Sequence, residues 1–205
     1  MAFPLELASV LTGATPAQLQ LWRTTGLVIP EVRPKRPPLY SFRDLVLIRS
    51  VVYLRARLSS QKVHKAFRGI EDVMDGVVHP SEYRFGTDGR TIYLGTESGE
   101  AIDILRRRGQ VSLFTFDDML ASFDNFKNEP VPDFYRPTEH LEVKPGRMGG
   151  WPTIEGTRVP YDDVARLVDD ETVFAEDVEL YFPSVSPDAA RDAVAFAERV
   201  EAVGA

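Results

Sequence analysis

Three cations lie close together in the stretch Arg33-Pro34-Lys35-Arg36-Pro37-Pro38. Proline has a fixed φ and no backbone N–H, so this stretch cannot continue a helix, and we expect an extended loop from which the cations protrude. Protruding cations attract polyanions such as the phosphates of nucleic acids. The chemistry predicted for this loop is therefore polyanion binding.

Other residue types give little support to catalysis or metal binding. The chain has no cysteine, which removes thiolate nucleophiles, disulfides and zinc–cysteine sites, and its three histidines are dispersed. No glycine-rich phosphate loop follows a predicted strand, and the pairs Asp117-Asp118 and Asp162-Asp163 are typical of helix starts and solvated faces. We expect no enzyme activity, no catalytic residue, no bound metal and no cofactor.

Charge is divided unevenly along the chain, whose formal net charge is −7. Residues 1–70 hold 11 Lys and Arg against three acidic residues, a net charge of +8. Residues 71–205 hold 13 against 28, a net charge of −15. This division predicts a basic module for a polyanion and an acidic module for a different partner.

Long apolar runs are missing from the sequence. No stretch approaches the ~18 apolar residues of a transmembrane helix, and no basic segment followed by an apolar run marks a signal peptide. We expect a soluble cytoplasmic protein without a membrane partner.

Residues 1–75 predict four short helices, with the proline-rich loop between the second and the third. Residue types suited to helix ends mark their limits, namely Gly13, Thr15, Pro16, Gly26, Ser41 and Asp44. Trp22 is expected in the core rather than stacked on a base.

Three segments of this region carry the features of a DNA reader. They are the run from Thr15 to Pro30, the run Tyr40-Ser41-Phe42-Arg43-Asp44-Leu45, and Leu54-Arg55-Ala56-Arg57 followed by Ser60-Gln61-Lys62-Val63. Over about residues 4–71 the chain resembles the winged helix-turn-helix of MerR-type regulators. It departs from them at Gln20-Leu21, where the family usually has Arg-Tyr, and in lacking a heptad pattern for the dimerising coiled coil after Ile70.

The resemblance implies operator DNA as a partner, read by a recognition helix in the major groove and a basic wing on the phosphates. Each arginine taken alone is equally explained as a solvated surface cation. The implied DNA-binding residues are Thr15, Gln18, Gln20 and Arg23 around the recognition helix, Arg33, Lys35 and Arg36 in the wing, and Tyr40 and Arg43 on phosphates.

Residues 76–144 predict a β-containing connection. Two strand-like runs flank the turn Asp88-Gly89, and further strands are expected at residues 102–105 and 111–116. Residues 127–146 are polar and contain four prolines, a composition typical of a linker.

Residues 145–205 predict a short β hairpin around Glu155-Gly156 and three helices. The first is expected to open at Pro160, the second to be capped by Thr172, and the third to start at Ser186-Pro187. The apolar residues assigned to the second helix are Phe174, Val178, Leu180 and Tyr181.

A dense motif opens this region, Gly149-Gly150-Trp151-Pro152-Thr153-Ile154-Glu155-Gly156-Thr157-Arg158-Val159-Pro160. With Tyr181-Phe182-Pro183 and residues 189–197, it resembles a bacterial family of antitoxins related to VapB, which are encoded beside PIN-like ribonuclease toxins. Trp151 stands where that family commonly has a basic residue. Together with the MerR-like start, the chain resembles the longer VapB-type antitoxins of actinobacteria.

The C-terminal region is too acidic to favour DNA, since residues 145–205 hold five basic and thirteen acidic residues. We infer that it makes protein contacts, in a dimer or with a toxin. Arg158 has two interpretations, a bidentate contact to the carboxylates of a nuclease and a pairing with Asp162 or Asp163 beside it. The candidate toxin or dimer contacts are Trp151, Ile154, Arg158, Tyr161 and Phe182.

The expected fold is mainly α with a small β segment, in three parts. They are an N-terminal winged helix-turn-helix (residues 1–75), a middle β hairpin or meander with a linker (76–144), and a three-helix homeodomain-like unit preceded by a short β hairpin (145–205). The favoured function is a homodimeric type II antitoxin that neutralises a PIN-like ribonuclease and represses its own operon. The alternative is a MerR-like regulator whose C-terminal half senses a small molecule.

Overall fold

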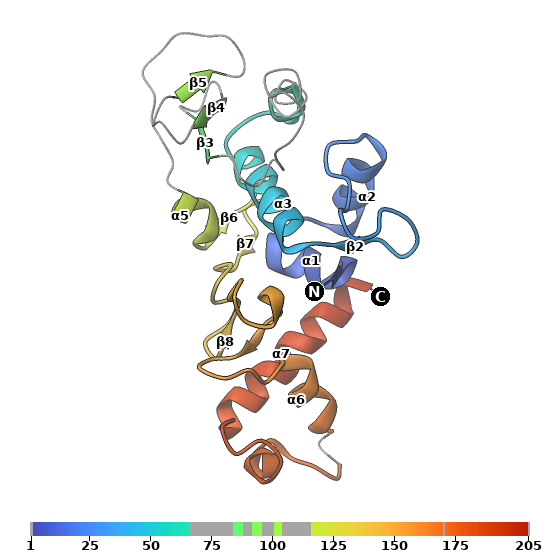
Figure 1. The fold of residues 1–205 in the computed structure, drawn as a ribbon, viewed down its shortest axis with the longest axis vertical. Helices are drawn as coiled ribbons and strands as arrows, with labels where there is room; N and C mark the ends of the chain where they lie inside the picture. Colours follow the sequence, from blue (N-terminus) through green and yellow to red (C-terminus); the bar gives the residue numbers. More distant parts are fainter. Residues whose placement is uncertain are drawn as a thin grey trace.

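The computed structural model describes residues 2–65, 84–87, 92–95, 101–103, 116–169 and 171–204. Its first part consists of β1 (Phe3–Pro4), α1 (Leu5–Thr12), α2 (Pro16–Thr24), β2 (Leu39–Tyr40), α3 (Phe42–Arg55) and a helical segment over residues 60–65. In Figure 1, α1, α2 and α3 gather at one level of the molecule, and α7 reaches them from below. The predicted succession of short helices is confirmed.

Local capping explains where these helices begin and end. The Thr15 hydroxyl accepts the backbone N–H of Gln18, and Gln18 Oε1 accepts the N–H of Thr15, which closes a capping box on α2. Ser41 and Asp44 form the same arrangement on α3. Gly13 ends α1 with a φ of 75°, a conformation that glycine adopts without strain. These predicted helix ends are confirmed.

A strand pair that the sequence does not predict joins the beginning of the chain to the end of the proline-rich loop. β1 and β2 are antiparallel, with Phe3 opposite Tyr40 and Pro4 opposite Leu39. Phe3 and Tyr40 are both buried, so the pair holds the end of the loop against the core.

The middle of the chain contains a three-stranded antiparallel sheet. β3 (Arg84–Thr87) pairs with β4 (Ile92–Gly95), which pairs with β5 (Ala101–Asp103). The predicted hairpin pairing is confirmed, and its Asp88-Gly89 turn lies outside the described residues.

The strand predicted over residues 111–116 is wrong at its last position. Phe116 begins the helix α5 (Phe116–Leu120), and residues 111–115 lie outside the described ranges. Asp117 and Asp118 fall in the first turn of this helix, where carboxylates favour a helix start.

Residues 127–146 do not form the linker that their composition predicts. β7 (Pro130–Val131) pairs with β6 (Phe123–Asp124), and β8 (Leu141–Glu142) follows. Val131, Phe134, Leu141 and Val143 are buried. The composition misleads because prolines and polar residues separate apolar side chains that each reach the core.

The C-terminal part consists of η2 (Met148–Gly150), β9 (Thr153–Ile154), α6 (Tyr161–Leu167), η3 (Ala175–Leu180) and α7 (Pro187–Gly204). β9 pairs with β8, and the hairpin predicted around Glu155-Gly156 is reduced to one bridge between Thr153 and Pro160. The predicted starts of the first and third helices are confirmed. The second is a 3-10 helix, η3, instead of the expected helix capped by Thr172.

The described fold is mixed helical with small antiparallel sheets. This agrees with the predicted fold class, mainly α with a small β segment. The winged and homeodomain-like features, and the domain boundaries, stay predictions. Within the part of the chain that the structure describes, no helix is long and apolar enough to cross a membrane.

One buried cluster runs from the first residues to the last helix. It includes residues of α1, α3, the segment 131–143, α6 and α7. Trp151 stacks on Phe3 with ring centroids 5.6 Å apart and on Tyr161 at 6.3 Å, and Tyr161 meets Phe196 edge-on at 4.8 Å. The N-terminal and C-terminal parts therefore share a core.

Arg49 of α3 lies fully buried at the centre of this arrangement. Its guanidinium donates to five backbone carbonyls at 2.6–3.0 Å, those of Leu11, Met119, Leu120, Ala121 and Pro132. Three of these carbonyls belong to the last turns of α1 and α5, where helices leave carbonyls without a partner. The guanidinium also faces the rings of Phe123 and Phe134, at 5.1 and 5.6 Å from their centroids.

Burial lowers the pKa of Arg49 to about 10, and the nearby Asp133 carboxylate opposes this shift. The side chain is therefore charged at neutral pH. It ties the N-terminal helices to residues more than 60 positions later in the chain, from α5 to Pro132.

We predict that Arg49→Met lowers the free energy of unfolding by about 3–5 kcal/mol, because carbonyls in the core lose a charged donor. Urea unfolding followed by tryptophan fluorescence measures the change. Arg199→Met, which removes the same charge from an exposed position on α7, should change stability by no more than about 0.5 kcal/mol. A loss below about 1 kcal/mol for Arg49→Met would contradict this role.

A glycine of the C-terminal motif sits directly against the N-terminal part. Gly150 has a φ of 84°, and a Cβ built on it would lie 2.2 Å from Cδ2 of Phe42, the first residue of α3. Any larger residue would both strain the backbone and displace the Phe42 ring. The absence of a side chain at this position lets the motif dock on α3.

We predict that Gly150→Ala costs about 2 kcal/mol or more of stability, the sum of strain and overpacking. Gly146→Ala is the matched control, since its Cβ would meet nothing within 4 Å and its φ is not positive. Thermal unfolding of the two variants should separate them by several degrees. Equal melting temperatures would show that the contact with Phe42 tolerates a methyl group.

Candidate functional site

The cationic loop, defined as residues 31–38, is closed at its base by hydrogen bonds. Arg33 and Leu39 exchange two backbone hydrogen bonds of 3.1 and 2.9 Å, and Arg33 Nε donates to the Pro37 carbonyl at 2.8 Å. Arg33, Lys35 and Arg36 are exposed, as predicted for cations on an extended loop. The loop thus offers its cations from a fixed stem.

A buried carboxylate fixes the start of the loop. Asp44 Oδ2 accepts the backbone N–H of Glu31 at 2.9 Å and that of Ser41 at 2.8 Å. The same residue therefore caps α3 and anchors the first residue of the cationic loop. Arg43 forms an ion pair with Glu31 at 3.8 Å, but both side chains are about half exposed, so this pair contributes little.

Arg23 joins α2 to the cationic loop. Its guanidinium donates to the Pro34 carbonyl at 2.8 Å and to Gln20 Oε1 at 2.7 Å. Gln20 and Arg23 are thereby brought beside the loop cations, a proximity that their sequence separation does not reveal. Figure 1 shows α2 and the loop leading to β2 on the same side of the molecule.

The remaining predicted DNA contacts are placed differently. The polar atoms of Thr15 and Gln18 already serve the capping box of α2, although both residues are partly exposed. Tyr40 is buried, and its burial raises the pKa of its hydroxyl to about 12. The structure therefore does not bring Tyr40 to the surface of the cationic loop, because its ring fills the core beside β1.

This region is strongly basic. Residues 2–65 hold ten Lys and Arg against three acidic residues, and the three loop cations are exposed. Helix α2, Arg23 and the cationic loop together form the reader surface, the name used below for Gln20, Arg23, Arg33, Lys35 and Arg36. Such a surface attracts a polyanion over a distance of about 10 Å at moderate salt.

The structure places two of the predicted C-terminal contacts in the core. Ile154 and Tyr161 are buried, because β9 and the first turn of α6 face the common core. Trp151 is partly buried, and its Nε1 donates to Asp162 at 2.8 Å while its ring stacks between Phe3 and Tyr161. Phe182 is also only partly exposed.

Arg158 does not pair with the first turn of α6. Asp162 and Asp163 instead pair with Arg166, which lies four and three positions later in the same helix. Arg158 is exposed and forms no ion pair with any residue of the described ranges. The interpretation as a local pair is therefore wrong, and a contact with a partner's carboxylates stays a prediction.

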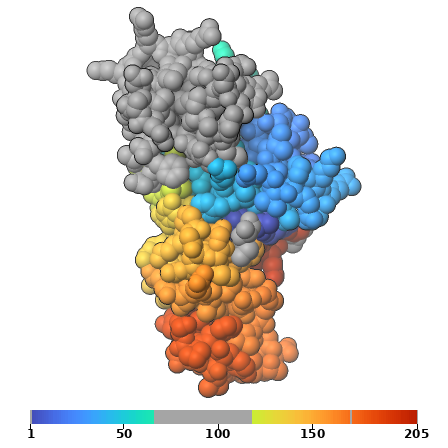
Figure 2. All heavy atoms as spheres, viewed as in Figure 1, coloured from blue at the N-terminus to red at the C-terminus, as the bar shows by residue number. Residues whose placement is uncertain are grey.

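The exposed apolar residues of this part lie elsewhere. Phe174, Leu180 and Tyr181 are 46%, 81% and 56% exposed, at the two ends of η3. We call these three residues the apolar tip. They belong to the orange-red end of the molecule, at the bottom of Figure 2.

The residues of the apolar tip are among those that the sequence assigns to the second C-terminal helix. A 3-10 helix has three residues per turn instead of 3.6, so the side chains that an α-helix would align do not all face inward. Val178 alone of the four expected apolar residues is buried.

Comparison with known proteins adds two findings. Residues 141–197 match the family model described as "Protein of unknown function (DUF433)". The match runs from β8 into α7, includes the whole glycine-rich motif, and covers well under half of the chain.

The chain is also similar to proteins described as uncharacterised HTH-type transcriptional regulators, from Mycobacterium bovis and from two strains of Mycobacterium tuberculosis. Each is 28% identical over 109 residues, which cover 48% of this chain and 45% of the relative. The match thus spans less than half the length of these relatives. No solved structure matches the chain.

Proposed function

We propose that this protein is a DNA-binding transcription regulator that contacts DNA through the reader surface. The observation that carries the proposal is the bond from Arg23 to the Pro34 carbonyl, which holds α2 and the cationic loop as one basic surface. The description of the similar mycobacterial proteins as HTH-type regulators supports it.

The dimensions of the reader surface suit duplex DNA. α2 has nine residues and is about 13 Å long, and a helix of this size fits the major groove. Gln20 and Arg23 would then face base edges or the near phosphates, while Lys35 and Arg36 would reach phosphates beside the groove. The helix–turn–helix order of α1 and α2, followed by a basic loop, fits the predicted winged arrangement.

We predict that the double variant Lys35→Ala/Arg36→Ala binds DNA about tenfold or more weakly than the wild type. The slope of log affinity against log salt should become shallower by about 2, because two phosphate contacts are lost. Fluorescence anisotropy measures both, with a duplex from the region upstream of the protein's own gene, between about 50 and 200 mM KCl.

Arg158→Ala/Arg199→Ala is the control for net charge. It removes two exposed cations from the acidic part and should leave the affinity within about twofold of the wild type. If both double variants weaken binding equally, the effect is one of net charge and the reader surface is misassigned.

We further propose that the C-terminal part is the partner-binding part of an antitoxin, whose partner is a PIN-like ribonuclease encoded by an adjacent reading frame. The motif of residues 149–160 supports this, as does the apolar tip, since large exposed apolar side chains mark protein interaction sites. The surplus of carboxylates here repels DNA and leaves this surface for a protein. We also propose that a homodimer of the protein represses its own operon.

We predict that co-expression of the protein rescues growth of cells that express the adjacent reading frame. Leu180→Asp should abolish the rescue, because it places a charge in the apolar tip. Leu21→Asp, at a position 53% exposed on α2, should rescue like the wild type. Circular dichroism confirms that both variants are folded. An adjacent frame that is harmless alone, or full rescue by Leu180→Asp, would refute the antitoxin assignment.

A further inference from the structure

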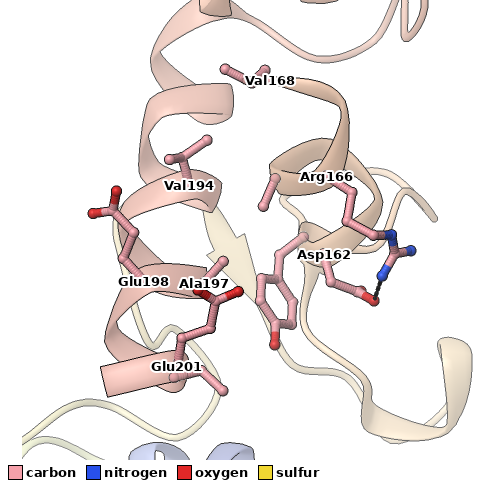
Figure 3. A pocket seen from close by; sticks show the side chains of 10 residues that line it. Asp162, Arg166, Val168, Val194, Ala197, Glu198 and Glu201 are labelled. Carbon is pink, nitrogen blue, oxygen red and sulfur yellow. Dashed lines mark hydrogen bonds and ion pairs between the residues drawn. The ribbon is translucent and has the colours of Figure 1, made fainter. Parts of the chain in front are cut away.

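A groove of about 440 Å³ lies between α6 and α7, on the side of the C-terminal part shown in Figure 3. Val194, Ala197 and Val200 line it from α7, with Ala165 and Val168 opposite. All but Val168 are only partly buried. Because Ala165 and Ala197 are small, the apolar lining is left uncovered between the two helices.

The carboxylates beside this groove differ in their partners. Asp162 accepts from Arg166 at 2.8 Å and from the Trp151 indole, so its charge is already balanced. Glu198 and Glu201 form no ion pair with the described residues. In Figure 3 the Glu201 carboxylate turns toward the gap, and Glu198 stands on the outer side of α7.

Both unpaired carboxylates are in unfavourable positions for the isolated chain. They are three residues apart on α7, a spacing at which like charges repel. They also lie in the last two turns of α7, where the helix dipole disfavours negative charge. A cation of a partner placed beside Glu198 and Glu201 would weaken both their mutual repulsion and the unfavourable interaction with the helix dipole.

We propose that the α6–α7 groove binds an amphipathic helix of a partner protein, with apolar residues toward Val194 and Val200 and Lys or Arg toward Glu198 and Glu201. Helices enter such grooves through apolar residues spaced three and four apart. This inference deepens the proposed partner binding and rests on it, by naming the element and charge of the partner.

The C-terminal part of a second copy of the chain is a poor occupant of this groove. The described residues from 116 onward hold 19 acidic and eight basic side chains, so two C-terminal parts repel each other. Nucleic acid is repelled for the same reason. A basic segment of another protein is the complementary partner.

The test uses the full chain and a fluorescein-labelled peptide of about 15 residues, with Leu at helical spacing and Lys on both flanks. We expect it to bind, and Glu198→Lys/Glu201→Lys to weaken binding at least tenfold. The matched control Glu171→Lys/Glu179→Lys changes the same charge at exposed positions away from the groove and should change affinity by less than threefold.

Methyl NMR locates the peptide, with shifts expected at Val168, Val194 and Val200. No binding, equal binding of a peptide with Glu in place of Lys, or equal weakening by the two double variants would overturn the groove assignment. None of these results decides the co-expression test, so the antitoxin proposal is tested separately. Conversely, peptide binding at the groove with failed rescue would leave the groove in place and reject the ribonuclease as its partner.

Discussion

The fold depends on one buried charge, the guanidinium of Arg49. A lone cation in an apolar core is costly, and this one is tolerated because five carbonyls and two aromatic rings surround it. The carbonyls come from α1, from α5 with the residue after it, and from Pro132. The side chain can be satisfied only when all three segments are in place, so it specifies their arrangement as well as stabilising it.

The same constraint explains how the glycine-rich motif is used. The segment after Pro132 returns along the core through Phe134, Leu141 and Val143, and β8 then pairs with β9 of the motif. Glu142, buried in β8, accepts from the Gly156 N–H at 2.9 Å and pairs with Arg147 and Lys144. The motif that resembles an antitoxin signature therefore has a largely structural role, and Arg158, which is exposed and forms no ion pair with the described residues, is the exception.

Local features of the fold could be predicted from the sequence, and distant ones could not. The caps at Thr15 and Ser41 depend on residues three positions apart, so their pattern is visible in the chain. The carbonyl partners of Arg49 lie 38 to 83 positions away, and nothing in the local pattern distinguishes it from the solvated arginines around it. For the same reason the sequence predicts Tyr40 on phosphates, whereas its pairing opposite Phe3 buries it. At the reader surface, the loop cations could be predicted, but the link from Arg23 to Pro34 required the folded chain.

The shared core fixes how the basic and acidic parts of the chain are arranged in space. Because α7 packs on α1 and Trp151 stacks on Phe3, the basic and acidic parts are held in a fixed relation instead of being joined by a linker. On the proposed function, the acidic part would repel the phosphates of a duplex approaching its own surface, and the field of the whole molecule would direct DNA toward α2 and the cationic loop. The same field would draw the proposed basic protein partner to the acidic part. Two partners of opposite charge can thus be sorted by one chain whose net charge, −7, resembles neither part.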